Sequence, residues 1–533
     1  MNALLWALQS GHALSLKPAA KALHTAFQDP AAAQHARWQR LIQANALSDY
    51  GRQHGFDRIH SMADYQRKVP VVDYEAVQPW IDRIAMGEQA VLTQAPVRML
   101  EPSGGSTSTN KYIPYTDDLL EDFARATNPW LHDLFSHVKG LKGTQSYWSI
   151  SLAKQGIRQT ERGVPIGFDD DTEYFSPLMR WALNRMMAVP NTVAQAADMD
   201  AWRWQTCLHL LRSESLGLIS VWSPTYLSLL MGYISHNLDV LLPALPAKRA
   251  QRIRHAIDQA GRLTGEALWP HLKLISCWTD SIAADFLPAL QQWFPHTPLQ
   301  GKGLLATEGV VSAPLLPEDG TGCPLAINSH FLEFVDLDHP ARSPLLAHEL
   351  RQGGAYSPIL STGGGLYRYH LKDVIHCVGH VAATPKVRFG GKLDRVSDLC
   401  GEKVHASQVE AALAQARHST GARWHFAMLA PVRGPSPHYR LFIDGDLSAD
   451  LLAGIGQQVE SHLATGHHYA ACRRLGQLGP LQAQAVAHGW QIFQRTLVAA
   501  GQRAGDIKPT ALDARHDWVK AFSTSEKGQA GVC

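Results

Sequence analysis

Short apolar runs alternate with long amphipathic runs between residues 90 and 278, and this alternation is what most limits the folds open to the chain. The strand-like runs are AVLTQ, VRMLEP, YWSISL, LISVWS and LKLISCW. The helix-like runs include LLEDFARATNPWLHDLF and KRAQRIRHAIDQAGRLTGEALW. Strands that alternate with helices in this way predict an α/β protein whose sheet is substantially parallel.

The stretch from Leu216 to Ile234 carries no charged residue and is long enough to suggest a membrane helix. Its interior favours another structure, because LISVWS has the β-branched and aromatic composition of a buried strand. Ser223 and Pro224 then supply an N-cap and a first-turn proline for a helix. We therefore predict a strand followed by a buried helix. The N-terminal run MNALLWALQSGHALSL similarly predicts an amphipathic helix rather than a secretory signal.

The residue pattern changes at Phe331, where short extended segments and glycine turns replace the long helical runs. This change predicts a β-rich subdomain that ends in a hinge near residue 390. Beyond it, two helix-like and two strand-like runs predict a small α+β domain. The expected organisation is a large N-terminal domain, residues 1–390, and a small C-terminal domain, residues 391–533.

Charge and cysteine content narrow the classes of function. Lys plus Arg total 49 against 47 for Asp plus Glu, so no basic block is available to follow a nucleic-acid backbone. The seven cysteines include no CxxC pair, and the 27 histidines show no zinc-ligand spacing. We expect a protein of the reducing cytoplasm that binds neither nucleic acid nor a membrane.

Four short motifs carry groups suited to nucleotide chemistry. The first is the loop from Ser103 to Lys111, whose backbone N–H groups, hydroxyls and lysine could wrap a polyphosphate. It lacks the spacing of a P-loop, and by composition alone an ordinary flexible loop is the alternative. The second is GLLATEG, where Glu308 could hold Mg²⁺ against phosphate oxygens beside the Thr307 hydroxyl. A glycine-bounded turn with a solvated glutamate is its alternative.

The third motif, GGGLYRYHLKD, combines a glycine turn, an aromatic strand and Asp373. An ionised carboxylate at a strand end can accept hydrogen bonds from both hydroxyls of a ribose, although an ordinary edge strand has the same pattern. The fourth is Lys508 in GDIKP. Most lysines near a C-terminus are solvated surface residues. Each motif alone is therefore open to a structural interpretation.

Together, and in this order, the four motifs resemble the auxin-responsive acyl acid amido synthetase family, particularly its bacterial branch. That family belongs to the adenylating superfamily, with acyl-CoA synthetases, luciferases and nonribosomal peptide adenylation domains. The resemblance covers nearly the whole chain and includes VPVVDYEAVQPWIDRI, VWSPTYL, ISCWTD, KGLLATEGV and GLYRYHLKDV. It implies that the large domain adenylates an acid and that the small C-terminal domain is mobile.

The resemblance also implies residue roles, with ATP and Mg²⁺ as cofactors. Lys508 is expected to be the adenylation lysine, Thr307 to serve the α-phosphate, and Glu308 to hold the metal. Lys392 and Asp394 correspond to the hinge. The ATP-binding residues are expected to be Ser103, Gly104, Gly105, Ser106, Thr107, Lys111, Thr307, Glu308, Tyr367, Asp373, Lys392 and Lys508.

The substrates implied by the resemblance are a small carboxylic acid and an amine or amino acid. For the acid we consider the residues that follow strand-like runs, where parallel sheets present binding loops. These residues are Trp222, Tyr226, Cys277 and Trp278, and core packing is their alternative role. The expected reaction forms an acyl-adenylate and then an amide.

Two other functions remain open. The acyl group could pass to coenzyme A or a carrier-protein thiol. The chain could also be a nucleotide-binding regulatory protein without turnover, because Ser108, Lys372 and Leu304 depart from the family pattern.

Overall fold

The chain forms two compact units in the computed structural model. The described residues are 2–103, 111–149, 159–167, 185–316, 320–393, 396–397, 399–400, 402–434, 436–475, 477–500, 502, 504, 507–514 and 517–527. The first unit consists of Met1–Thr279 and Gln291–Phe389, and the second consists of Asp280–Leu290 and Gly390–Cys533.

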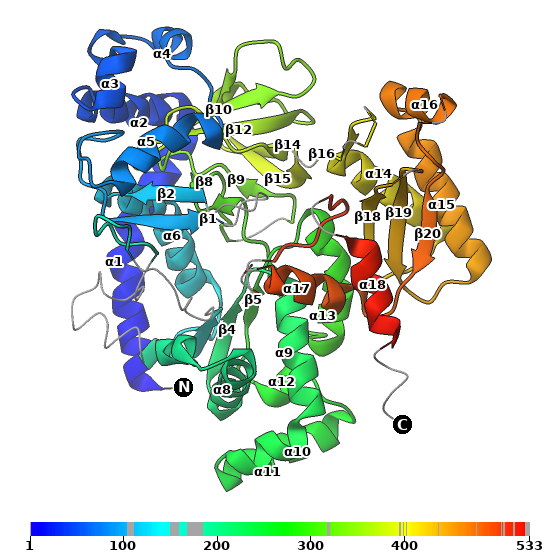
Figure 1. The fold of residues 1–533 in the computed structure, drawn as a ribbon. Coiled ribbons are helices and arrows are strands. Elements are labelled where there is room, and N and C mark those ends of the chain that lie inside the picture. The colour runs from blue at the N-terminus through cyan, green and yellow to red at the C-terminus, as the bar shows by residue number, and fades with distance from the viewer. Residues whose placement is uncertain are drawn as a thin grey trace. The chain divides into compact units, whose positions relative to one another are not determined.

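A four-stranded parallel sheet lies in the first unit, in the order β3-β4-β5-β6. Its strands are β3 (Gln145–Trp148), β4 (Leu216–Ser220), β5 (Leu274–Ser276) and β6 (Leu299–Gln300). β4 and β5 are buried along their whole length, as expected of apolar strands covered on both faces. Helix α9 (Pro224–His236) follows β4 (Figure 1). The Ser223 hydroxyl accepts from the backbone N–H of Thr225. The predicted strand and helix over Leu216–Ile234 are therefore confirmed.

Helices cover the N-terminal part of the first unit. Helix α1 (Ala3–Gln28) packs along α6 (Asp117–His137), with Leu23 and Phe27 on its buried face. Asp29 ends α1 and caps α2 (Pro30–Ala44), whose first residue is proline. The N-terminal helix predicted from the sequence is confirmed. Among the described residues, no helix combines the length and hydropathy needed to cross a membrane.

One predicted strand is wrong. The run AVLTQ, Ala90–Gln94, is described throughout and contains no strand. The carbonyl oxygens of Ala90 and Val91 instead accept from the N–H groups of Asp49 and Tyr50, at the start of α3 (Asp49–His54). Ala90 also has a φ of 57°, which breaks an extended run. These carbonyls satisfy the amide groups that a helix start leaves unpaired.

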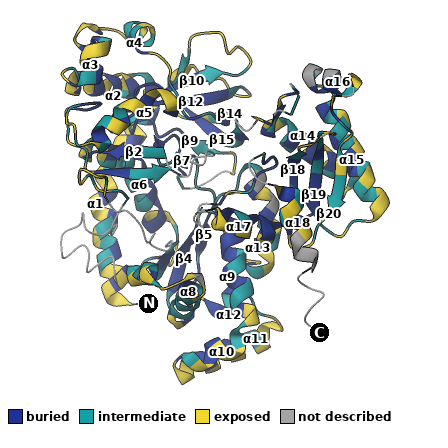
Figure 2. Cartoon of the chain, in the orientation of Figure 1, coloured by how far each residue is buried: buried dark blue, intermediate teal, exposed yellow. Residues whose placement is uncertain are grey.

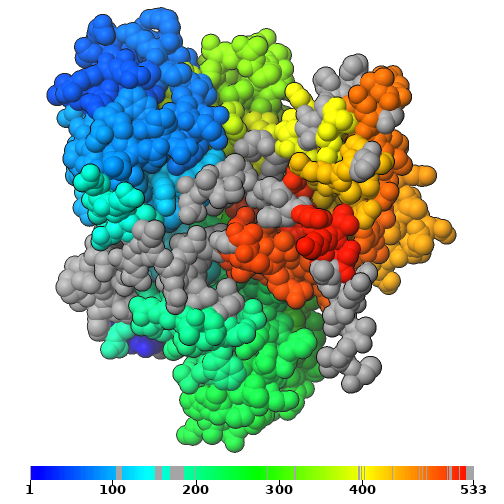
Figure 3. All heavy atoms as spheres, viewed as in Figure 1, coloured from blue at the N-terminus to red at the C-terminus, as the bar shows by residue number. Residues whose placement is uncertain are grey.

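A second sheet of the first unit is antiparallel, in the order β11-β10-β12-β14-β15-β9, with β13 paired to β12. Apart from β10, its strands are β11 (Leu345–Leu346), β12 (Ala355–Ser361), β14 (Asp373–Val381), β15 (Thr384–Lys392), β9 (Cys323–Pro324) and β13 (Tyr369–His370). Phe331, Leu332 and Phe334 of β10 (Phe331–Asp336) belong to the main hydrophobic core, together with residues of α2 and α5 (Tyr74–Ala85). Figure 3 shows the N-terminal segment, in blue, lying against the yellow-green residues of this sheet. The β-rich subdomain predicted after Phe331 is thus present.

The second unit contains a sheet of β18 (Phe426–Val432), β19 (His438–Asp444) and β20 (Gln482–Ala485). β18 and β19 are antiparallel, whereas β20 is parallel to β19. Helices α14 (Ala406–Thr420) and α15 (Ala449–Leu463) pack against each other, and their buried residues share one core with this sheet. Figure 2 shows dark, buried strands beside helices that are yellow on their outer faces. This is the α+β arrangement predicted from the sequence.

The remaining elements complete the two units. The other helices are α4 (Met62–Lys68), α8 (Met199–Arg212), α10 (Leu238–Leu241), α11 (Ala247–Ala260), α12 (Gly265–Leu268), α13 (Leu287–Trp293), α16 (His467–Arg474), α17 (Gly489–Ala499) and α18 (Trp518–Lys527). The other strands are β1 (Met99–Ser103), β2 (Lys111–Tyr115), β7 (Leu305–Ala306), β8 (Gly309–Val310), β16 (Val396–Ser397) and β17 (Val404–His405).

Candidate active site

The first predicted phosphate motif joins the two strands of an antiparallel hairpin. Ser103 ends β1 and pairs with Lys111, which begins β2. The Lys111 ammonium lies over the ring of Tyr74, with its Nζ 5.1 Å from the ring centroid. The predicted residues Gly104, Gly105, Ser106 and Thr107 lie outside the described residues, as does Ser108. The hairpin therefore places Ser103 and Lys111 opposite each other, where the two strands meet the loop.

The second motif forms the tight turn between β7 and β8, with Thr307 and Glu308 at its tip. The Tyr115 hydroxyl donates to the carbonyl oxygen of Thr307 at 2.9 Å, and the Ser103 hydroxyl donates to Oε1 of Glu308 at 3.4 Å. Glu308 is buried. Burial raises the pKa of the Tyr115 phenol, with further increases from Glu101 and Glu308, so this phenol remains a neutral donor. The fold thus brings the first two motifs together.

Tyr74 and Tyr369 extend the surroundings of Glu308. Burial raises the pKa of each phenol, and the Glu308 carboxylate raises both further. Val72 forms a parallel bridge with Tyr369, which holds the segment before α5 beside the third motif. Tyr74, Tyr115 and Tyr369 were not predicted as site residues, because their positions depend on pairings between distant parts of the sequence.

The third motif differs from the predicted aromatic strand. Only Tyr369 and His370 form a strand, because Arg368 and Lys372 have φ values of 51° and 57°. Asp373 begins β14 and is buried. The ammonium of Lys372 pairs with Asp73 at 3.5 Å, so this departure from the family pattern stabilises the turn before Asp373.

Tyr367, also predicted to contact ATP, lies in the core of the first unit. Its ring stacks on Tyr50 with 5.0 Å between centroids and meets Phe56 edge-on. Its hydroxyl donates to the carbonyl oxygen of Leu92 at 2.9 Å. Leu304 likewise belongs to this core. The described contacts of both side chains are those of packing residues.

The remaining predicted ATP and hinge residues belong to the second unit. Lys392 ends β15, and Lys508 is an exposed residue just before a bridge between Leu512 and β18. Asp394 lies outside the described residues.

The predicted acid-binding residues gather at the carboxyl ends of the parallel strands. Trp222 follows β4, and Cys277 and Trp278 follow β5. The N–H of Trp278 donates to the carbonyl oxygen of Trp222 at 2.8 Å, and the centroids of the two indole rings are 5.8 Å apart. Both tryptophans are half-buried, whereas Cys277 is fully buried and its pKa is raised to about 12 by burial. The carboxyl edge of a parallel sheet is where α/β enzymes bind ligands.

Tyr226 has a structural role in this region. It lies in α9, and its hydroxyl shares a hydrogen bond of 2.5 Å with the hydroxyl of Tyr147 on β3. Both tyrosines are buried, and burial raises the pKa of each phenol.

Sequence reasoning missed Lys302, which follows β6 at the same edge of the sheet. Its Nζ lies 2.8 Å from Oγ of Ser220, at the end of β4. The same nitrogen lies 5.1 Å from the ring centroid of Trp222, 5.4 Å from that of Trp130 and 5.9 Å from that of Trp148. The rule that selected Trp222 and Trp278, namely residues after a strand, would also have selected Lys302.

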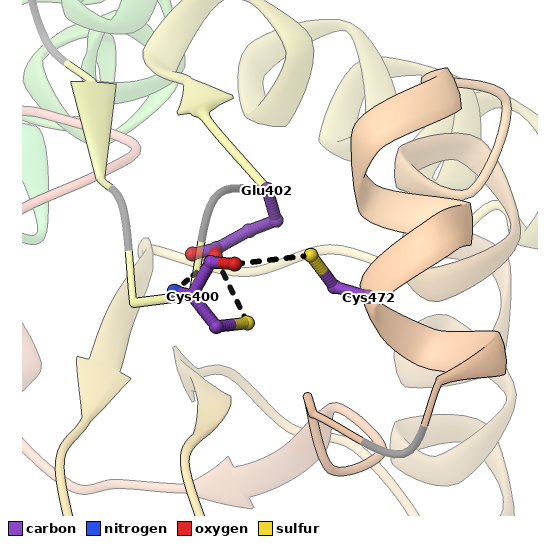
Figure 4. Close-up of side chains that lie close together, drawn as sticks. All are labelled: Cys400, Glu402 and Cys472. Carbon is purple, nitrogen blue, oxygen red and sulfur yellow. Dashed lines mark hydrogen bonds between the residues drawn. The ribbon is translucent and has the colours of Figure 1, made fainter.

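A cluster of two thiols and a carboxylate lies in the second unit. Ligand atoms of Cys400, Glu402 and Cys472 lie within 4.8 Å of one another (Figure 4). Both thiols donate hydrogen bonds: Cys400 to Glu402 at 3.3 Å, and Cys472 to the carbonyl oxygen of Cys400 at 3.4 Å. Glu402 also accepts from the Tyr439 hydroxyl at 2.5 Å and from the N–H groups of Leu399 and Cys400. Through these contacts the Glu402 carboxylate holds the surrounding loop in place.

Replacing Glu402 with alanine should lower the stability of the second unit by about 3 kcal/mol, because the buried Tyr439 hydroxyl and the part-buried donors of Leu399 and Cys400 lose their acceptor. Burial alone would raise the pKa of Glu402, but the hydrogen bonds from Tyr439 and the backbone outweigh it and lower the pKa below the ordinary 4.5. The stabilising charge is therefore present above about pH 4.5 and is lost as the pH falls through the lowered pKa. Denaturant titrations of the wild type and Glu402→Gln should converge on acidification; a gap independent of pH would contradict this.

These elements build the fold of a solved acyl acid amido synthetase. The structure matches the solved AtGH3.15 acyl acid amido synthetase in complex with 2,4-DB with a TM-score of 0.81, 17% identity, and 96% coverage of each chain. Models of the GH3 family N-terminal, central and C-terminal domains match residues 19–245, 323–392 and 407–514. The chain therefore belongs to the GH3 family, and the predicted family and fold class are confirmed.

Curated relatives match over most of their length. The 4-substituted benzoates-glutamate ligase GH3.12 of Arabidopsis thaliana is 19% identical over 88% of this chain and 90% of its own. The jasmonoyl--L-amino acid synthetase JAR4 of Nicotiana attenuata is 20% identical over 87% of each chain.

Proposed function

We propose that this protein activates a small carboxylic acid with ATP as an acyl-adenylate and transfers the acyl group to an amino acid or another amine. The observation that carries this proposal is the meeting of the Ser103 and Glu308 motifs, within a chain that the GH3 models match along most of its length. The amide-forming ligases among its relatives support the second half-reaction.

The residues around Glu308 fit a magnesium ion and a phosphate. Carboxylate and hydroxyl oxygens are the donors that Mg²⁺ prefers, and nucleotide-bound Mg²⁺ takes only one or two protein carboxylates. Glu308 would hold the metal, which offsets charge on the phosphate oxygens when bound. Ser103, Thr307 and Lys111 would contact the phosphates, with residues 104–107 completing the loop. Asp373 would accept hydrogen bonds from the ribose hydroxyls.

Lys508 would stabilise the negative charge that grows when the acid carboxylate attacks the α-phosphate. Lys392 and Asp394 would form the hinge about which the C-terminal domain, residues 391–533, moves between the half-reactions. The adenylate is a mixed anhydride, so the second step mainly needs an oriented neutral amine and exclusion of water. We assign the protein to the reducing cytoplasm, in keeping with the absence of a disulfide among its described cysteines.

Exchange of pyrophosphate into ATP tests the first half-reaction. With a panel of aromatic and aliphatic acids, we expect exchange that requires the acid and Mg²⁺ and is lost in Glu308→Gln. Absence of exchange with every acid, combined with tight ATP binding, would favour a regulatory protein without turnover.

Product mass tests the second half-reaction. When free amino acids and coenzyme A compete for the same adenylate, the expected product is the amide. Accumulation of the thioester alone would make the protein a thioester ligase.

A further inference from the structure

The Lys302 ammonium lies among aromatic rings, and no carboxylate of the described residues pairs with it. It lies over the faces of Trp130, Trp148 and Trp222 and hydrogen-bonds to Ser220. Among the residues that the structure describes, no acidic side chain forms an ion pair with it. An ammonium held in partly apolar surroundings without a counter-ion is costly, and a bound anion would offset that cost.

Part of the side-chain surface around Lys302 remains exposed, where a ligand would make contact. Lys302, Trp148 and Trp222 are half-buried, whereas Trp130 is buried behind them. The tryptophan faces offer an aromatic ring a stacking partner, and the ammonium offers a carboxylate a charged donor. An aromatic acid has both groups in one molecule.

The backbone of Lys302 is fixed on both sides. A Cβ at Gly301 would lie 2.7 Å from Oγ1 of Thr279, so the chain approaches this side chain closely. Gly303 has a φ of 69°, and a Cβ there would lie 2.4 Å from the carbonyl oxygen of Ser312. Gly303 therefore requires glycine, whereas a side chain at Gly301 would have to displace the Thr279 hydroxyl, so the lysine lies in a closely packed turn.

The position of Lys302 in the chain links the sheet edge to the phosphate motif. Thr307 lies five positions further along the chain, a span of at most about 18 Å. A carboxylate at Lys302 and an α-phosphate at Thr307 and Glu308 would thus be held by one short segment of the chain. The ammonium would orient the carboxylate while its oxygen bonds to the α-phosphorus and the bond from that phosphorus to pyrophosphate breaks.

We propose that Lys302 binds the carboxylate of an aromatic acid whose ring packs against Trp148 and Trp222. This inference rests on the proposed function for the role of the acid, but the binding itself requires no ATP.

A charge cycle between protein and ligand tests the proposal. Indole-3-acetate and its neutral amide, indole-3-acetamide, are titrated against the wild type, Lys302→Met and Lys302→Arg, with the heat of binding in a calorimeter as the readout. The wild type should bind the acid at least about tenfold more tightly than the amide, because the charged hydrogen bond is lost with the amide. Lys302→Met should lose this preference, and Lys302→Arg should keep part of it. Benzoate and benzamide provide a second pair.

Lys273→Met is the matched control, because Lys273 precedes β5 at the opposite end of the same sheet. It should retain the preference for the acid. The melting temperature of Lys302→Met should be unchanged or higher, since a methionine in the aromatic cluster removes a poorly solvated charge. A purely structural lysine would instead lower the melting temperature and leave the preference for the acid intact.

The pH dependence gives a further readout. Burial lowers the pKa of Lys302 to about 8, and the thiol of Cys277 is its titratable neighbour among the described residues. Acid binding by the wild type should therefore weaken as the pH rises through and above about 8, whereas Lys302→Arg should show no such decline. A bound carboxylate raises the lysine pKa, so the affinity should fall from about pH 8 and level off above the raised pKa of the complex.

The outcomes separate the two proposals. If the wild type does not distinguish the acids from the amides, or if Lys302→Met keeps the full preference, the Lys302 assignment is overturned. Charge-dependent binding without pyrophosphate exchange would support the acid site and overturn the proposed function. Exchange with an unchanged KM for the acid in Lys302→Met would overturn the Lys302 assignment alone.

Discussion

Lys508→Ala should slow acyl-adenylate formation at least about 100-fold, which corresponds to about 3 kcal/mol of lost transition-state stabilisation. The surrounding backbone is suited to hold a catalytic cation. Ile507 and Thr510 are buried on either side of the exposed lysine. Leu512 bridges to β18, and the N–H of Leu429 donates to the carbonyl oxygen of Ala511 at 2.7 Å. The chain is thereby anchored to the sheet while the side chain extends outward.

The measurement separates the half-reactions. Acid-dependent pyrophosphate exchange reports adenylation, and a chemically prepared acyl-adenylate supplied with an amine reports transfer. Exchange should fall while transfer from the prepared adenylate continues. Lys520→Ala, at another exposed lysine of the second unit, should change neither rate. Normal adenylation with blocked transfer in Lys508→Ala would contradict the assignment.

Arg368→Met should destabilise the first unit by about 3–5 kcal/mol, because it leaves Glu333 buried without its counter-ion. Arg368 Nε donates to one Glu333 oxygen at 2.9 Å, and a second guanidinium nitrogen donates to the other at 3.0 Å. The third nitrogen donates to the carbonyl oxygens of Gln66 and Val69, at the end of α4. Both charged side chains are almost fully buried. The guanidinium therefore joins a helix, a strand and the turn that leads to Asp373.

Denaturant unfolding and hydrogen exchange of Met62–Lys68 would measure this loss. The double variant Arg368→Met, Glu333→Leu should recover part of the lost stability, because both members of the buried ion pair are then replaced and no unpaired charge of that pair remains. Arg67→Met is a suitable control because Arg67 forms an exposed pair with Asp64, and it should change stability by less than about 1 kcal/mol. Equal effects of Arg368→Met and Arg67→Met would contradict a special role for the buried pair.

Local signals in the sequence predicted much of the fold. Ser223 and Pro224 marked a helix start that the structure contains, and the β-branched run before them marked a buried strand. The error at Ala90–Gln94 has a clear cause: an apolar run was assigned to a strand, whereas its carbonyls pair with the start of α3. Such pairing depends on tertiary structure, and periodicity within a short window does not carry it.

The candidate site was predictable in a similar, partial way. Motifs with unusual glycine and charge patterns identified Ser103, Glu308 and Asp373 from the sequence. The tyrosines around Glu308 and the tryptophans around Lys302 come from segments far apart in the chain, and their grouping appears only when the sheet pairings are known. The inclusion of Asp280–Leu290 in the second unit has the same origin, since Phe286 packs against Trp490.

The chain connects the two units at three places rather than one. The chain passes between them after Thr279, after Leu290 and after Phe389. The first passage comes one residue after Trp278, and the second leads within a dozen residues to Lys302. The second passage lies within α13 and the third within β15, so a rotation of the second unit would have to be accommodated across a helix and a strand as well as after Thr279. Because the first passage comes just after Trp278, the covalent chain itself would link the edge of the parallel sheet to any rotation of the second unit.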